Sequence, residues 1–249
     1  MRKKYIIITL AIVIIGFGVF VSRLARLPSE EIMTERFITA NPLNLKQIQG
    51  FSKYRSCVGH DYRAPTLAGE MEKSPRSMKH YVVVKPEFRG TIDKVDAFAP
   101  FDGEISVVKN ELYSGSQVWL TPNLRRALKW QFIFFHITLD KGLQNGTKVT
   151  VGQHIGTAYL KRGPDGTTDN FDIGLKFTQP MRRPAVDALF GHARQSVVEE
   201  YAKYGVRVDD LIISEGDRDL SPCPLSSRYD GPDVTFPHSM LADDYVWLK

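Results

Sequence analysis

The chain has 249 residues, of which 43% are hydrophobic, 11% aromatic and 24% charged, a composition that indicates a packed globular core and excludes an intrinsically disordered chain. The formal net charge is +5, but Arg2, Lys3 and Lys4 contribute three of the positive charges, which leaves about +2 for the rest. This balance gives no basis for a nucleic-acid partner.

An apolar segment from Tyr5 to Val21 follows these three basic residues and contains no charged residue, Asn, Gln or Pro. Its 17 residues are just long enough to cross the hydrocarbon core as a helix. The positive-inside rule keeps the basic lead in the cytoplasm and exports everything after Val21. A cleaved signal peptide is the alternative, although Val19–Arg23 offers no small-x-small cleavage site. We therefore expect residues 1–22 to be a single-pass membrane anchor and the folded part to be extracytoplasmic.

Residues 23–50 have the pattern of a stalk that leads into an entry segment and spaces the domain from the bilayer. Pro28-Ser29-Glu30 is a helix-start signal, and Asn41-Pro42 is a break. We expect a β domain over residues 51–180, followed by a C-terminal helix and a wrapping tail over residues 181–249.

Short runs rich in Val, Ile, Phe and Trp, separated by turn residues, predict strands in the β domain. The predicted strands are His80–Val84, Gly103–Val108, Ser116–Leu120, Trp130–Ile137 and Phe171–Phe177. This spacing indicates a mainly β fold with an antiparallel sheet or barrel. Helical periodicity follows in Pro184–Tyr204, with Gly205 as the expected end, and the proline-rich final residues read as an extended tail.

Two cysteines occur, Cys57 near the start of the domain and Cys223 near the end of the chain. In an oxidising compartment they would form a disulfide bridge; the alternative is two separate buried thiols.

Four short segments with distinctive residues follow one another along the predicted β domain: Gly59-His-Asp-Tyr62, Ala97-Phe-Ala-Pro-Phe-Asp-Gly-Glu-Ile105, Phe134-Phe-His-Ile137 and Val149-Thr-Val-Gly-Gln-His-Ile-Gly156. In this order they resemble the lysostaphin-type or LytM-like zinc endopeptidase domain, also called the duplicated hybrid motif. Members of this family cut peptide cross-links in bacterial cell walls. The resemblance covers about 120 residues, from Cys57 to Phe177. It implies a lysostaphin-like sheet or barrel, a pattern that also occurs in lipoyl-carrier-like barrels.

The departures from the family pattern fall on the metal site. The resemblance implies Asp61 as a zinc ligand and His136 as a catalytic histidine. Cys57 stands where the family has its first histidine ligand, and Asp172 and Gly174 stand where it has a His-x-His pair. A catalytic zinc needs three protein ligands and an open position for water. The direct interpretation is that the barrel is kept and the metal site is dismantled.

A relocated site is the alternative interpretation. His60 adjoins Asp61, and His80 opens the following strand, so these three residues are candidate metal ligands. His136 and Asp172 are expected in the same groove, where such groups bind zinc or carry out acid–base chemistry. His80 could equally satisfy a backbone carbonyl, and Asp61 could equally serve as a turn residue.

The leading hypothesis is a non-catalytic domain, without cofactor, that binds or scaffolds an envelope polymer or envelope protein. Its groove would be lined by His60, Asp61, His80, His136 and Asp172. One alternative is a zinc metalloendopeptidase with rearranged ligands that acts on peptidoglycan or similar wall peptides. The other is a structural subunit of a membrane complex, in which the long tail makes the contacts.

Overall fold

The computed structural model describes residues 28–162, 166–225, 235–237 and 242–249. The core of the fold is one 11-stranded sheet whose main path runs β13-β1-β2-β11-β6-β5-β4-β7. Strand β12 pairs with β11, β8 joins β3 to β6, and β9 and β10 form a separate hairpin. The strands are β1 (Ile48–Ser52), β2 (His80–Val84), β3 (Asp96–Phe98), β4 (Gly103–Glu111), β5 (Gly115–Pro122), β6 (Trp130–Leu139), β7 (Lys148–Val149), β8 (His154–Ala158), β9 (Lys161–Arg162), β10 (Gly166–Thr167), β11 (Asn170–Phe177), β12 (Ala185–Asp187) and β13 (Tyr245–Trp247).

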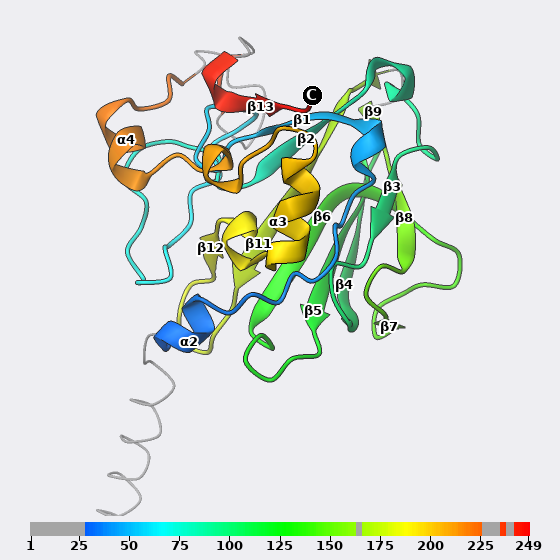
Figure 1. The fold of residues 1–249 in the computed structure, drawn as a ribbon, viewed down its shortest axis with the longest axis horizontal. Helices are drawn as coiled ribbons and strands as arrows, with labels where there is room; N and C mark the ends of the chain where they lie inside the picture. Colours follow the sequence, from blue (N-terminus) through cyan, green and yellow to red (C-terminus); the bar gives the residue numbers. More distant parts are fainter. Residues whose placement is uncertain (1–27, 163–165, 226–234, 238–241) are drawn as a thin grey trace, which may run out of the picture.

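Short helices surround the sheet (Figure 1). The α-helices are α2 (Glu30–Met33), α3 (Gln195–Ala202) and α4 (Glu215–Leu220), and the 3-10 helices are η1 (Leu45–Gln47), η2 (Pro86–Phe88), η3 (Leu189–His192), η4 (Val208–Leu211) and η5 (Ala242–Asp244). The mainly β, antiparallel architecture predicted from the sequence is confirmed. All five predicted strands are present, four of them one to three residues longer than their apolar runs and one with the predicted bounds.

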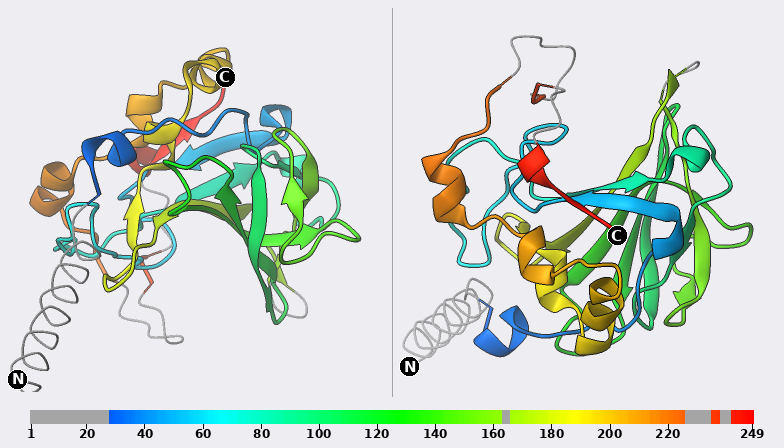
Figure 2. Two further views of the ribbon diagram at one scale, coloured as in Figure 1. Left: turned by 90° about the horizontal axis from the view of Figure 1, so that it is seen from below. Right: turned by 45° about the horizontal axis from the view of Figure 1, so that its top comes forward.

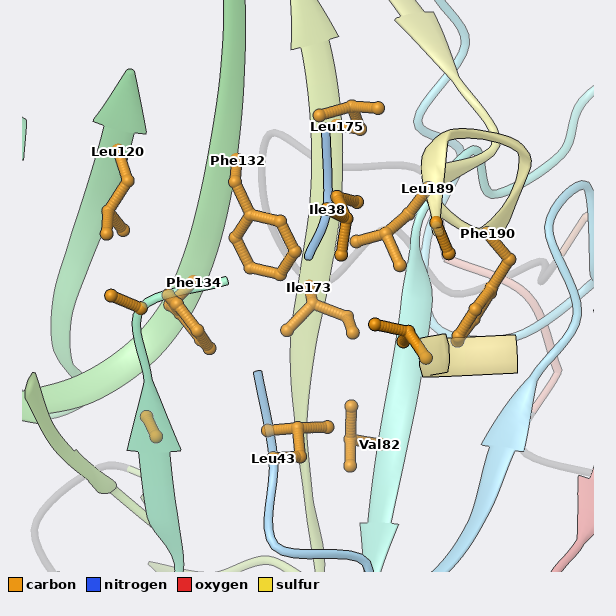
Figure 3. Close-up of a cluster of buried hydrophobic side chains, with 14 of the residues drawn as sticks. Ile38, Leu43, Val82, Leu120, Phe132, Phe134, Ile173, Leu175, Leu189 and Phe190 are labelled. Atoms are coloured by element: carbon orange, nitrogen blue, oxygen red, sulfur yellow. The ribbon is translucent and has the colours of Figure 1, made fainter. Parts of the chain in front are cut away.

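The sheet is curved and buries one face, which we call the core face (Figure 2). Large apolar side chains from successive strands meet on this face, as Figure 3 shows for Leu120, Phe132, Phe134, Ile173, Leu175 and Val82. Each of these side chains is almost completely buried. Full burial of one such side chain contributes roughly 1.5–3 kcal/mol, so this layer is the main source of stability.

Residues 28–50 pack into the domain and do not form a spacer. The side chains of Phe37, Ile38, Leu43, Leu45 and Ile48 are buried in the main core, and Ile38 and Leu43 lie against the sheet in Figure 3. The expected helix start at Ser29 does begin helix α2. The prediction of a spacer is wrong for residues 28–50, because the apolar side chains that follow α2 are buried in the core of the domain.

The C-terminal region is also more structured than its sequence suggested. The expected helix over 184–204 is shortened to α3, because Ala185–Asp187 pairs with β11 as strand β12 and Gly191 falls within η3. The tail adds α4 and, through β13, an edge strand paired with β1. Cys57 and Cys223 form a disulfide bridge, as one of the two sequence alternatives predicted.

The turn between β7 and β8 explains part of the fourth sequence motif. Gly152 has φ +76°, and a Cβ on Gly156 would stand 2.1 Å from the carbonyl oxygen of Thr138. The first glycine therefore permits the turn, and the second lets β8 approach the backbone of β6. The predicted anchor, residues 5–21, lies outside the described ranges. Within those ranges no helix has the length and apolar character needed to cross a membrane.

Candidate functional site

Strands β2 and β11 decide which predicted site residues meet, because neighbouring residues on a strand point to opposite faces. His80 is paired with Ile173, and Tyr81 is paired with Asp172. Ile173 lies in the hydrophobic core, so His80 belongs to the core face. Asp172 and Tyr81 belong to the opposite side of the sheet, which we call the outer face.

On the outer face, Lys79 and Asp172 form a buried ion pair. Lys79 Nζ lies 2.5 Å from Asp172 Oδ2, and only 3% and 1% of the two side chains are exposed. The ammonium also lies 4.6 to 5.2 Å from the ring centroids of Phe135, Tyr62 and Tyr81. Three aromatic rings and one carboxylate therefore enclose a single cation, an arrangement in which both ionic and cation–π attraction act in a desolvated space.

A row of residues crosses four strands beside this pair. Val107, Trp119, Ile133 and Gly174 are successive cross-strand partners on β4, β5, β6 and β11. A Cβ on Gly174 would lie 3.6 Å from Phe135 Cε2 and 3.7 Å from Lys79 Cβ. The ion pair thus occupies the space that a larger side chain at position 174 would enter.

Lys176, two residues further along β11, lies over Trp119. Its Nζ is 4.3 Å from the ring centroid, and burial lowers the pKa of this lysine. The indole nitrogen of Trp119 is buried and has no hydrogen-bond partner within the described part of the chain. The outer face therefore presents a partly exposed aromatic ring with a cationic neighbour.

His80 does not line the outer face. Its side chain is 1% exposed, and its Nδ1 lies 2.8 Å from the carbonyl oxygen of Ser52, to which it donates. The ring packs edge-on against Phe190, with ring centroids 4.9 Å apart. Burial lowers the pKa of His80 to about 4, although the bond to Ser52 acts in the opposite direction. His80 is thus a neutral core residue, which corrects its expected place in a groove or a metal site.

Asp61 is held by arginine and by the backbone. Its carboxylate accepts hydrogen bonds from Arg63 Nε, at 2.9 and 3.1 Å, and from the backbone N–H of Arg76 at 3.1 Å. His60 Nδ1 lies 3.3 Å from the hydroxyl oxygen of Tyr81, and the residue forms a β-bridge with Thr235. Asp61 therefore stabilises a turn, and His60 contacts the C-terminal segment, so neither belongs to a set of metal ligands in the described part of the chain.

His136 lies at a bulge in β6. Ser116 pairs with Ile137 and Val118 with Phe134, so two residues of β6 face the single residue Gln117. The bulge gives His136 a φ of +60°, a conformation that few non-glycine residues adopt.

The bulge directs the His136 ring to Glu111 at the end of β4. His136 Nδ1 lies 2.8 Å from Glu111 Oε2 and 3.1 Å from the carbonyl oxygen of Ser114. Two acceptors at Nδ1 place a proton there, so Nε2 is the basic nitrogen of the neutral ring. Burial alone would raise the pKa of Glu111, but hydrogen bonds from His136 and Gln117 outweigh it and hold the pKa below its usual value.

These residues do not fit a catalytic zinc. Cys57 is bonded to Cys223, and the carboxylates of Asp61 and Asp172 face Arg63 and Lys79. No group of three His, Cys, Asp or Glu side chains that could hold a metal ion occurs in the described ranges. The structure pairs Asp172 with Lys79 and does not bring it together with Asp61 and His80 in a metal site.

Two residues of this site, Lys79 and Glu111, were missed by sequence reasoning. Lys79 directly precedes a strand that is buried along its whole length, so no alternation revealed which neighbour faces outward. Its partner is 93 residues away in the sequence. For Glu111, the only signal was its position next to the β4–β5 turn, where polar residues are ordinary.

No protein-family model matches the sequence, and a comparison with curated protein sequences gives no match. Similar solved structures include a zinc-containing peptidase from Vibrio cholerae, lysostaphin in solution, and Csd3 from Helicobacter pylori. Their identities to this chain are 16%, 16% and 14%, over 65%, 51% and 85% of its length, with TM-scores of 0.36, 0.31 and 0.36. The alignments cover 41%, 49% and 45% of the matched structures, so this chain spans less than half of each. Lysostaphin gives its name to the family that the four sequence segments resemble. At TM-scores below 0.5 these similarities support no conclusion about the site.

Proposed function

We propose that this chain is a membrane-anchored, extracytoplasmic protein whose lysostaphin-like β domain binds an envelope component without cleaving it. The observation that carries the proposal is the Lys79–Asp172 pair. A fixed ammonium neutralises a carboxylate at the position where the resembled peptidase family places the first, catalytic histidine of its His-x-His pair.

Charge is the physical reason why this pair argues against hydrolysis. A hydrolytic zinc site supplies a Lewis acid and a bound water, which requires unpaired ligand atoms around an open position. In this chain, Lys79 Nζ is already enclosed by Asp172 and three aromatic rings. A second cation beside this ammonium would be repelled in a space of low dielectric constant.

The disulfide supports an extracytoplasmic location. Disulfides persist in oxidising compartments and are rare in the cytoplasm. The Cys57–Cys223 bridge is buried, and Arg218 and Asp244 bond to Cys57 and to each other around it. Together with the apolar segment Tyr5–Val21, it supports an anchored domain outside the membrane.

The outer face supplies a surface for binding. Thr121 lies two residues beyond Trp119 on β5 and therefore points to the same face. It helps to line a pocket of about 270 Å³ with Glu104, Ser106, Asn123 and other residues. An aromatic ring beside a pocket that contains hydroxyl, amide and carboxylate groups suits a polar polymer with some apolar surface.

Binding and cleavage can be tested together by incubating the purified chain with insoluble peptidoglycan sacculi. We expect the chain to sediment with the sacculi and to release no peptide fragments, with or without added zinc. Trp119→Ala should weaken sedimentation at least about tenfold, because exposed aromatic anchors dominate binding surfaces. Trp247→Ala is the matched control: Trp247 is 38% exposed but lies on β13, at the other edge of the sheet.

Zinc-dependent release of fragments would refute the non-catalytic role. Absence of sedimentation would refute an envelope polymer of this type as the ligand. Equal losses in the two tryptophan variants would refute the outer face as the binding surface.

A further inference from the structure

Three segments that are far apart in the sequence meet at one end of the molecule, which we call the α2 end. They are helix α2, the β5–β6 loop of residues 123–129, and the β11–β12 turn of residues 178–184. The N–H of Thr178 donates to the carbonyl oxygen of Lys129 at 2.8 Å, and Trp130 Nε1 donates to that of Ile32 at 3.3 Å. Figure 1 shows the α2 end at the bottom, opposite the C-terminus.

Both connecting segments present apolar side chains to solvent at this end. Leu128 is 54% exposed and Met181 is 68% exposed, and Leu124 is 39% exposed. Met181 also has a φ of +61°, which residues other than glycine adopt rarely and at an energetic cost. Large exposed apolar residues gathered on loops are typical of an interaction site.

Basic residues accompany these apolar side chains. Arg125, Lys129 and Arg183 are exposed, and Arg126 and Arg182 lie in the same two segments. The acidic residues of this end belong to the α2 segment and are Glu30, Glu31 and Glu35. Arg126 lies 3.8 and 3.9 Å from Glu31 and Glu35, so two of the acids already face a positive charge. The end as a whole is positive, and exposed apolar groups beside Lys and Arg suit the interface of an anionic bilayer.

The route of the chain brings this end to the membrane. The predicted anchor ends at Val21, and the packed domain begins at residue 28, directly before α2. The six intervening residues span at most about 20 Å when fully extended. Because residues 34–48 pack into the core, they add no length to this connection.

We infer that the α2 end is a docking surface for a lipid bilayer rich in anionic headgroups. The inference rests on the membrane anchor of the proposed function. Leu124, Leu128 and Met181 enter the headgroup region, and the basic side chains of the two segments pair with lipid phosphates. Leu128 also lines the outer-face pocket, so this pocket opens beside the bilayer, whereas the C-terminal end is directed away from it.

Hydrogen exchange of the full chain in lipid nanodiscs tests this orientation. Amides of residues 123–129 and 178–184 should exchange more slowly in nanodiscs that contain phosphatidylglycerol than in phosphatidylcholine alone. The double variant Arg125→Glu/Arg183→Glu should lose this protection by more than about tenfold, since each basic side chain near an anionic surface shifts the equilibrium about fivefold. Leu128→Ser/Met181→Ser should also reduce it.

The matched control is Arg89→Glu/Lys161→Glu, two exposed basic residues near the β9–β10 hairpin at the opposite end. Protection that does not depend on phosphatidylglycerol, or that falls equally in the control, would overturn the docking surface. Flotation with phosphatidylcholine liposomes reports on the anchor separately. A chain that fails to float refutes the anchor, whereas one that floats without protected loops refutes only the docking surface.

Discussion

Lys79→Met is the substitution whose effect the structure defines most sharply. It removes the ammonium but keeps most of the apolar stem, so the packing against Tyr62, Tyr81 and Phe135 is largely retained. The variant keeps the Asp172 carboxylate, which is 1% exposed, but removes the Lys79 ammonium that lies 2.5 Å from it.

Breaking a buried ion pair from one side costs about 3–5 kcal/mol, because an uncompensated charge stays in the interior. A domain of ordinary stability, about 5–15 kcal/mol, would lose a large fraction of its free energy of unfolding. The double variant Lys79→Met/Asp172→Leu replaces both charges with apolar groups and should recover to within about 1 kcal/mol of the parent.

Urea denaturation at neutral pH with the disulfide oxidised, followed by tryptophan fluorescence, measures these free energies. Arg63→Met is the control, because it breaks the ion pair between Arg63 and Asp61, in which the arginine side chain is 36% exposed. The free energy of unfolding of this variant should fall by no more than about 1 kcal/mol. A single-variant loss below about 1 kcal/mol, or additive losses in the double variant, would refute a tightly coupled buried pair.

Three further predictions concern the core, the disulfide and the bulge. His80 has a pKa of about 4 in the folded chain and about 6.5 in the unfolded chain, so the unfolded chain binds a proton first as the pH falls. Up to about 3 kcal/mol of stability is therefore lost between pH 6.5 and 4. His80→Leu should flatten this part of the plot of stability against pH, and an unchanged slope would contradict the assignment of His80 as a neutral core residue. Reduction of Cys57–Cys223, which closes a loop over 166 residues, should lower the free energy of unfolding by about 5 kcal/mol, and equal urea midpoints with and without reductant would argue against it. His136→Ala should leave the fold intact, at a cost of about 1 kcal/mol because the interactions of Nδ1 with Glu111 and Ser114 are lost, and should weaken sedimentation with sacculi; unchanged binding counts against a role for His136 in binding.

The antiparallel strands could be predicted from sequence because turn residues separate compact apolar runs. The run Trp130–Ile137 and the glycines of Val149–Gly156 carry their structural meaning locally, in side-chain type and backbone freedom. The presence of two cysteines in a chain predicted to be exported likewise suggested a bridge, and the structure brings Cys57 and Cys223 together.

The site depended on strand register and on contacts between distant residues. Strand β2 is buried along its whole length, so its sequence has no alternation to show that His80 faces the core while Tyr81 faces the outer side. Only pairing with β11 settles this point, and only the folded chain brings Lys79 to Asp172 across 93 residues. The local sequence determined which segments become strands. Tertiary structure decided which charges share a buried space, because a one-residue difference in register moves a side chain to the other face of the sheet.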